Sequence, residues 1–350
     1  MQHWNWRLFA SILLLSMLIA VSIAQQRHTT RTPSDLNVIL IGWDGAGRER
    51  VRQCLQQGEL PHLAQLASEG KLVAIDILRT TDTKAGWTQI LTGYEPEKTG
   101  VYSNARYQPI PPGYTLFERL EQHFGKDHIA TVAVMGKRGN VDADPPTKVL
   151  AEPIERRARA GRAPAMQRLR QGKIITENGV RYLVEPGKPF YHARQAMDVF
   201  INGLIRDDAV GEKTLEMLER YQHQRFFFFV HFAEIDHQGH QYGENSKQYI
   251  DALKSADRWL GNIVWKLKEL GLYEKTLIYV TSDHGFDRDR NTHADAPYVF
   301  LATNDAGVMR RGTRADIAPT ILHRFGIDPK KLDPPLDGHP LTQPYRPPIW

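Results

Sequence analysis

The stretch Asn37-Val-Ile-Leu-Ile-Gly-Trp43, followed directly by Asp44, indicates the fold class of this chain. The same pattern, a continuous apolar run that leads to an acidic residue, occurs twice more. The other two runs are residues 226–232, before Asp236, and residues 276–282, before Asp283. Continuous rather than alternating hydrophobicity is typical of strands that are buried on both faces. The three runs therefore predict a mostly parallel central sheet covered by helices.

Helical patterns alternate with these strands, and the spacing predicts helices over 46–57, 116–124, 207–221, 246–270 and 315–325. Strands that alternate with helices favour the α/β class, here a three-layer α/β/α sandwich. Ligands bind beyond the carboxyl ends of the strands in such sheets. The three aspartates at strand ends are therefore candidate site residues before any chemistry is considered.

Length and composition exclude some classes of protein. The chain has 350 residues, with 41% hydrophobic and 24% charged content, which is enough apolar material for a large core. This apolar content excludes disorder throughout the chain. A disulfide-stapled miniprotein is also excluded, because Cys54 is the only cysteine. Length suggests two domains, but one large domain with an insertion fits equally well. We predict a catalytic domain over 36–328, interrupted at about 105–200 by a substrate cap, and a proline-rich tail over 329–350.

The N-terminus has the pattern of a secretory signal peptide. Arg7 precedes an apolar run over 8–24, and Ser22-Ile-Ala24 places small residues at the expected cleavage site. An uncleaved anchor helix is the alternative, because the apolar run is close to the short limit for crossing a bilayer. We expect a signal peptide over 1–24, a linker over 25–35, and an exported protein, periplasmic or secreted, without stable membrane insertion after cleavage.

The formal net charge of +5 is concentrated in one segment. Residues 154–173 carry six arginines and one lysine against one glutamate. A nucleic-acid surface would combine such charge with aromatic platforms, and this segment has no aromatic residue. Two interpretations remain: a solvated helical insertion, or a funnel that attracts an anionic substrate or lipid.

Metal-ligand spacing occurs in two segments that follow the second and third apolar runs. Asp236 and His240 lie four residues apart, and Asp283-His284 is followed nine residues later by His293. Together with Asp44, these residues give three carboxylates and three imidazoles at or just beyond strand ends. Mixed nitrogen and oxygen ligands suit Zn²⁺ better than Mg²⁺. Each residue alone could equally be a capping aspartate or a structural histidine.

The set of motifs as a whole resembles the alkaline phosphatase superfamily. It comprises Asp-Gly after the first strand, Thr83 nine residues before Thr92-Gly, the later Asp-x-x-x-His, and Ser-Asp-His-Gly at 282–285. The nearest branch is that of the type I phosphodiesterase/nucleotide pyrophosphatases and the sulfatase-like hydrolases. The resemblance covers about 36–104 and 207–341, and it implies an alkaline-phosphatase-like fold.

The resemblance also implies two divalent metal ions, which we expect to be zinc. One ion would be held by Asp236, His240 and His293, and the other by Asp44, Asp283, His284 and the oxygen of Thr83. Thr83 would be the catalytic nucleophile and form a phosphothreonine intermediate, because metal ligation lets a threonine hydroxyl react as an alkoxide.

Three further residues are candidates for substrate binding. The resemblance implies that Asn104 donates to a phosphoryl oxygen of the substrate. The alternative is that Asn104 is only a structural residue of a turn. Lys137 and Arg138 follow a predicted strand at 130–135, and they are either a phosphate clamp or part of a solvated turn. The superfamily pattern there is Lys-x-Arg, from which the adjacent pair departs.

Other hydrolase classes lack their signatures in this chain. Thr83-Lys-Ala-Gly-Trp87 stands where a sulfatase needs Cys/Ser-x-Pro-x-Arg, and no Gly-x-Ser-x-Gly elbow occurs. The sequence therefore predicts a metal-dependent hydrolase of phosphoric esters with a small-molecule substrate and no nucleic-acid partner. Monoesters and diesters both fit. The alternatives are a sulfatase-like ester hydrolase without formylglycine and a non-catalytic homologue that binds metal or anions.

Overall fold

The computed structural model describes residues 36–345. The predicted signal peptide and linker lie outside the described residues, as does the end of the predicted tail. Within 36–345, none of the helices combines the length and the hydropathy that crossing a membrane requires.

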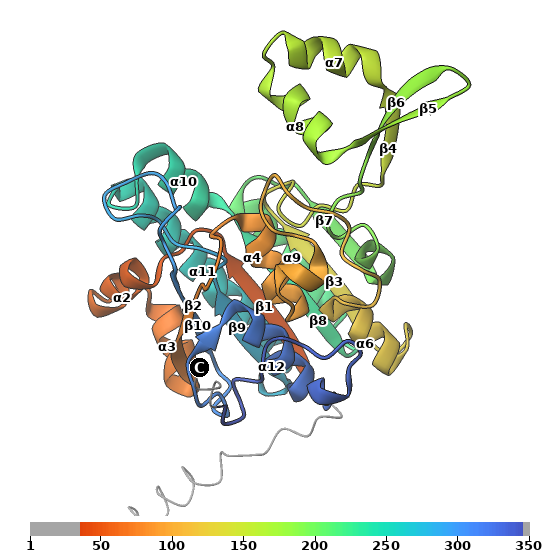
Figure 1. Ribbon diagram of the computed structural model, residues 1–350. Helices are drawn as coiled ribbons and strands as arrows, with labels where there is room; N and C mark the ends of the chain where they lie inside the picture. Colours follow the sequence, from red (N-terminus) through yellow and green to blue (C-terminus); the bar gives the residue numbers. More distant parts are fainter. Residues whose placement is uncertain (1–35, 346–350) are drawn as a thin grey trace, which may run out of the picture. The chain divides into compact units, whose positions relative to one another are not determined.

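An eight-stranded sheet forms the centre of the molecule, with the strand order β11-β2-β10-β9-β1-β8-β3-β7 (Figure 1). The strands are β1 (Asn37–Trp43), β2 (Lys71–Asp76), β3 (Ala130–Met135), β7 (Val199–Asn202), β8 (Phe226–Phe232), β9 (Thr276–Thr281), β10 (Tyr298–Thr303) and β11 (Gly312–Thr313). All pairings are parallel except those of β10, which runs antiparallel to β2 and β9. The predicted mostly parallel sheet is confirmed.

The three apolar runs of the sequence form the three adjacent strands β9, β1 and β8, and nearly every side chain in them is buried. The register brings their ends level, because Gly42 near the end of β1 pairs with His231 on β8 and with Thr281 on β9. The acidic residues that follow the three strands therefore emerge at the same edge of the sheet.

Helices cover both faces of the sheet, which confirms the three-layer α/β/α sandwich (Figure 1). One layer contains α2 (Arg48–Gln56), α3 (Pro61–Glu69), α9 (Asp207–Arg220), α10 (Glu234–Tyr242) and α11 (Lys247–Glu269). The other contains α4 (Thr83–Thr92), α5 (Pro96–Thr99), α6 (Leu116–Phe124) and α12 (Ile317–Arg324). Alternate side chains of β1 pack on opposite faces of the sheet. Val38 and Leu40 belong to one hydrophobic core, and Ile39 and Ile41 belong to the other. Short 3₁₀ helices are η2 (Ala193–Ala196), η3 (Tyr273–Lys275), η4 (Arg314–Asp316) and η5 (Pro329–Lys331).

A second, three-stranded antiparallel sheet lies within the segment predicted as an insertion. It has the order β4-β6-β5, built from β4 (Thr147–Leu150), β5 (Lys173–Glu177) and β6 (Val180–Glu185), with α7 (Ala151–Arg159) and α8 (Ala163–Gln171) beside it. Its small core consists of Ala151, Ile154, Ala165 and Leu183. α6 and β3 fall within the predicted 105–200 boundaries but belong to the main layers, because β3 is buried throughout between β7 and β8.

Close packing against Gly42 connects the sheet to the layer that contains α4. A Cβ atom at Gly42 would lie 2.3 Å from Cη2 of Trp87. The Trp87 ring is fully buried and lies edge-on to the ring of His231, with 5.1 Å between centroids. A glycine at this position therefore lets the tryptophan pack directly over the strand.

We predict that Gly42→Ala lowers the free energy of unfolding by about 1–3 kcal/mol, because the added methyl group overpacks a filled core. Denaturant unfolding of the wild type, Gly42→Ala, Trp87→Phe and the double variant measures the effect. The smaller ring should recover part of the loss in the double variant. A loss that is the same with either ring would refute this steric explanation.

Candidate active site

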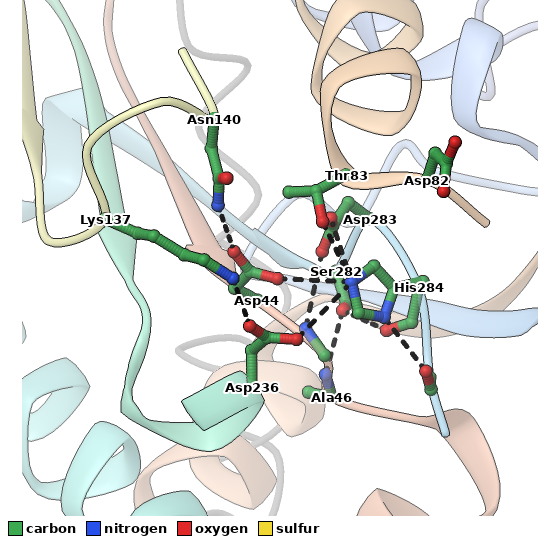
Figure 2. A network of polar contacts seen from close by, with 12 residues as sticks. Asp44, Ala46, Asp82, Thr83, Lys137, Asn140, Asp236, Ser282, Asp283 and His284 are labelled. Atoms are coloured by element: carbon green, nitrogen blue, oxygen red, sulfur yellow. Dashed lines mark hydrogen bonds and ion pairs between the residues drawn. The ribbon is translucent and has the colours of Figure 1, made fainter. Parts of the chain in front are cut away.

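Three buried carboxylates and one histidine converge at the carboxyl ends of β1, β8 and β9 (Figure 2). Nε2 of His284 lies 3.4 Å from Oδ1 of Asp44, 3.5 Å from Oδ2 of Asp283 and 3.7 Å from Oδ1 of Asp236. The hydroxyl oxygen of Thr83 lies 3.2 Å from the same nitrogen. Residues from four separate parts of the chain thus meet around a single point.

The predicted metal ligands form two groups in space. In each group, one ligand atom per residue lies within 4.8 Å of the others. The groups are Asp236 with His240 and His293, and Asp44 with Asp283 and His284. This division matches the one that the family resemblance implies, and Thr83 lies beside the second group.

Helix α10 presents two ligands of the first group on one face. It begins directly after β8, so Asp236 and His240 lie one turn apart, with Nε2 of His240 3.2 Å from Oδ1 of Asp236. Nδ1 of His240 contacts the carbonyl of Asn291 at 3.0 Å. His293 completes the group, with its ring centroid 5.1 Å from that of His240. Its ring also stacks on that of His284, with 3.9 Å between centroids.

The backbone after β9 is held in place from both sides. The Ser282 hydroxyl accepts from the amide of Ala46 at 3.0 Å and donates to the carbonyl of His284 at 2.7 Å. The guanidinium of Arg314, which is buried, donates to the carbonyl of Asp283 at 2.7 Å. Gly45 has a φ of +78°, and a Cβ there would approach Cα of Asp236 to 3.0 Å. The absence of a side chain at Gly45 therefore lets the chain after β1 approach the first turn of α10 closely.

Thr83 is the first residue of α4, and its side chain is buried. The helix N-terminus favours negative charge at this point, because its first amide groups lack intrahelical partners. Oδ1 of Asn104 accepts from the amide of Lys84 at 2.9 Å, and the amide of Asn104 donates to Oδ2 of Asp82 at 3.0 Å. The structure therefore places predicted Asn104 beside the predicted nucleophile.

The two members of the predicted phosphate clamp have different surroundings. Lys137 forms an ion pair with Asp236, which places its ammonium group at the carboxylate cluster. Arg138 is mostly exposed, and its nearest acidic partner is Asp144, at 3.7 Å. The structure therefore brings Lys137 into the site but leaves Arg138 at the surface.

Two further residues that the sequence analysis did not identify contact Asp44. Nδ2 of Asn140 donates to Oδ2 of Asp44 at 2.6 Å, and Nε2 of His231 contacts the same oxygen at 3.0 Å. Oδ1 of Asp44 is left facing the cluster. A histidine inside the apolar run 226–232 was an available signal for His231, whereas Asn140 lies in a loop without a local pattern.

The charges in this site are strongly coupled. Burial, together with the charges of Asp44 and Asp236, raises the pKa of Asp283 well above its usual value. Burial opposes the charged form of His284, but Asp283 and Asp44 raise the pKa of that imidazole to about 10. The same opposition acts on Lys137. Burial lowers the pKa of its ammonium group, but the carboxylates of Asp44 and Asp236 raise it above the usual value. The site accumulates negative charge that cations or protons must balance.

The buried atoms without hydrogen-bond partners show where a cation fits. Within residues 36–345, Oδ1 of Asp44, Oδ1 of Asp236, Oδ2 of Asp283 and Nδ1 of His293 form no hydrogen bond, although imidazole nitrogens lie 3.2–3.5 Å from the three oxygens. Buried polar atoms are normally satisfied, so unpaired acceptors gathered in one place indicate a ligand that they would bind. Carboxylate oxygens and imidazole nitrogens are ligands of divalent metals, and this donor set suits zinc. The residues present therefore fit the implied metal ions.

Comparison with solved structures places the fold among the alkaline-phosphatase-like folds. The alkaline phosphatase from the Antarctic bacterium TAB5 has a TM-score of 0.50 and 16% identity, with 85% of this chain and 99% of that chain covered. The phosphonate monoester hydrolase SpPMH from Silicibacter pomeroyi has a TM-score of 0.55 and 16% identity, over 87% of this chain and 76% of that one. At this identity the likeness concerns the fold alone.

The model of the type I phosphodiesterase / nucleotide pyrophosphatase family matches residues 38–334, so the chain belongs to this family. A curated relative is bis(5'-adenosyl)-triphosphatase ENPP4 of Bos taurus, which is 25% identical over 288 residues. The alignment covers 81% of this chain but 55% of that protein. The chain therefore spans about half the length of this relative.

We predict that Asp283→Asn stabilises the metal-free protein at pH 8. A carboxyl group whose pKa is higher in the folded state than in the unfolded state makes the free energy of unfolding fall as the pH rises above about 4. The amide removes this contribution, so Tm with chelator at pH 8 should rise by about 2–4 °C over wild type. Near pH 4 the advantage should disappear.

Thermal melts at both pH values measure the difference between the variant and the wild type. Asp251→Asn, which changes an exposed carboxylate on α11, is the control and should show no such gain. A metal-free Asp283→Asn protein that is less stable than wild type at pH 8 would contradict the electrostatic account of the site.

Proposed function

We propose that this protein is a metal-dependent hydrolase of phosphoric esters that uses Thr83 as a covalent nucleophile. The observation that carries the proposal is the position of the Thr83 hydroxyl, 3.2 Å from Nε2 of His284 and next to three buried carboxylates with unpaired oxygens. Membership of the type I phosphodiesterase / nucleotide pyrophosphatase family supports the same reaction class.

The proposal includes two divalent cations, for which zinc is the best match. Asp236, His240 and His293 would hold one ion, and Asp44, Asp283, His284 and Thr83 the other. Bound there, such ions would supply Lewis-acid stabilisation of phosphoryl oxygens and lower the pKa of the threonine hydroxyl. Two doubly charged ions would slightly outweigh the three aspartates, and this balance favours an anionic phosphoryl group over a neutral ester.

The reaction at Thr83 would be an in-line displacement at phosphorus. Oγ1 loses its proton to solvent and forms the new bond to phosphorus, and the ester oxygen leaves with the electron pair of the broken bond and takes up a proton. Water then hydrolyses the phosphothreonine and regenerates the hydroxyl. The N-terminus of α4 would stabilise the negative charge on the attached phosphoryl group, because it directs its partial positive charge toward Thr83.

Lys137 and Asn104 would orient the substrate. Lys137 provides an ammonium group at the edge of the carboxylate cluster. Since Oδ1 of Asn104 accepts from the amide of Lys84, the group that Asn104 offers to a phosphoryl oxygen is its Nδ2 donor. A phosphate clamp by Arg138 stays a prediction, as does export through the signal peptide predicted at residues 1–24.

We propose a phosphodiester or phosphoric anhydride rather than a monoester as the substrate. The family model is that of a phosphodiesterase and pyrophosphatase, and ENPP4 is named as a triphosphatase of a dinucleoside substrate. A sulfatase-like ester hydrolase and a non-catalytic metal-binding homologue are the competing functions. A panel of bis-nitrophenyl phosphate, nitrophenyl phosphate and nitrophenyl sulfate distinguishes the three possibilities.

We predict that Thr83→Ala lowers kcat for bis-nitrophenyl phosphate by about a thousandfold or more, because the nucleophile is lost. Elemental analysis should still find metal, since the carboxylate and imidazole ligands remain. The matched control is Thr88→Val on the same helix, which should remain active. Thr88 is buried, and its hydroxyl forms no hydrogen bond with any other part of residues 36–345. Full activity in Thr83→Ala, or a sulfate rate far above both phosphate rates, would reject the proposal.

We also predict that Asn140→Ala weakens zinc binding by about 10–100-fold, because Oδ2 of Asp44 loses a donor that orients the carboxylate. Competition titration against a coloured chelator measures the dissociation constant directly and does not depend on turnover. Asn262→Ala, an exposed change on α11, is the control. Equal zinc affinity in wild type and Asn140→Ala would show that Asn140 does not position this ligand.

A further inference from the structure

Two lysines lie close to the ring of Tyr107, beside the candidate active site. Nζ of Lys84 lies 5.6 Å from the ring centroid, and Nζ of Lys188 lies 5.1 Å from it. Lys188 also donates to the phenol oxygen of Tyr107 at 2.7 Å. The Tyr107 ring thus brings together two ammonium groups from residues more than 100 positions apart in the sequence.

The lysine pair is connected directly to the nucleophile. Lys84 follows Thr83 on α4, and its amide donates to the side chain of Asn104, three residues before Tyr107. The ammonium group of Lys84 donates to the carbonyl of Gly139. That loop also supplies Lys137 and Asn140, which contact the carboxylate cluster. A group bound between the two lysines would therefore adjoin the phosphoryl group at Thr83.

Lys84 and Lys188 differ from most partly buried lysines in their surroundings. Within residues 36–345, neither ammonium group forms an ion pair with a carboxylate, and each donates to a neutral oxygen instead. Asp142 is buried and acts on both lysines electrostatically, and Glu185 also acts on Lys188, in each case from beyond ion-pair distance. Partial burial of the two ammonium groups costs free energy that an arriving anion would offset.

Other basic residues nearby are paired. Lys137 pairs with Asp236, Lys148 with Glu177, and Arg168 with Glu185. Lys84 and Lys188 differ from these residues in that each ammonium group contacts only a neutral oxygen, a backbone carbonyl or a phenol. Both ammonium groups therefore lack a direct carboxylate contact within residues 36–345, and Lys84 directly follows the predicted nucleophile Thr83.

We propose that Lys84, Lys188 and Tyr107 form a subsite for a second anionic group of the substrate, a phosphate or a carboxylate. This group would be carried on the alcohol portion of the ester, next to the phosphoryl group that Thr83 attacks. The inference rests on the proposed function and narrows its substrate class to phosphoric esters or anhydrides with an additional negative charge. The ammonium groups supply point charges, and the ring supplies an apolar wall.

The test compares diesters that differ only in this charge. Ethyl nitrophenyl phosphate has no second anion, carboxymethyl nitrophenyl phosphate has a carboxylate, and phosphonomethyl nitrophenyl phosphate has a phosphonate. The leaving group is the same in all three. We expect wild-type kcat/KM to be about tenfold or more higher for the charged esters than for the ethyl ester. The two charged esters distinguish a carboxylate from a phosphate ligand.

Variants at Lys188 separate charge from shape. Lys188→Met should lower the ratio of charged to ethyl ester by about fivefold or more, and Lys188→Glu should lower it further, whereas Lys188→Arg should retain most of it. Lys247→Met, which removes an exposed lysine on α11, is the matched control and should keep the wild-type ratio. If Lys188→Met does not fold, the salt dependence of the wild-type ratio decides, because a charge-based preference must shrink between about 0.05 and 0.5 M salt.

The outcomes distinguish this subsite from the proposed function. A wild type that hydrolyses the ethyl ester but has a ratio near one overturns the subsite and leaves the hydrolase proposal intact. A ratio that is high but unchanged in both Lys188→Met and Lys188→Glu also overturns it. A wild type that hydrolyses none of the three esters overturns both proposals.

Discussion

The level ends of β9, β1 and β8 are the constraint on which the rest of the structure depends. Because Gly42 pairs with His231 and Thr281, the residues that follow these strands meet at one edge of the sheet. Three carboxylates are thereby buried together, at an electrostatic cost that hydrophobic packing cannot remove. The surrounding cationic and donor groups, including His284 and Lys137, offset that cost only in part. Divalent cations of the kind that we propose would offset the remaining cost.

Much of the site could be predicted from the sequence because its residues follow directly from local features. A carboxylate after a continuous apolar run lies at a strand end, and an aspartate four residues before a histidine shares a helix face with it. Asp44, Asp236, His240 and Asp283 are all positions of this kind. Thr83 could be predicted as the nucleophile only from the family resemblance, because a threonine at the start of a helix has no chemical signature of its own.

Residues that act through long-range contacts could not be predicted. Asn140 reaches Asp44 across 96 positions of sequence, from a loop whose composition indicates only a turn. Residues of the main layers that precede the small sheet were harder to separate from it by sequence.

The segment 105–200 combines prolines and basic residues with two elements of the main layers, α6 and β3. A local signal for α6 was present, since Thr115 and Glu118 form a capping box at its start. The antiparallel direction of β10 also depends on tertiary context, because its apolar pattern resembles that of its parallel neighbours.

Thr83 adjoins groups of both charges, and this bears on how a substrate would approach. The carboxylates of Asp44, Asp236 and Asp283 converge on His284, next to the Thr83 hydroxyl. Lys84 follows Thr83 on α4 and shares the Tyr107 ring with Lys188. Without divalent cations, the carboxylates would repel an anionic ester, because His284 and Lys137 offset their charge only in part. With the two cations that we propose, the cluster would instead attract a phosphoryl group, and the proposed lysine subsite would attract a second anion on the same substrate. Binding of a multiply charged ester at Thr83 would therefore depend on the charge state of the cluster as well as on the lysines.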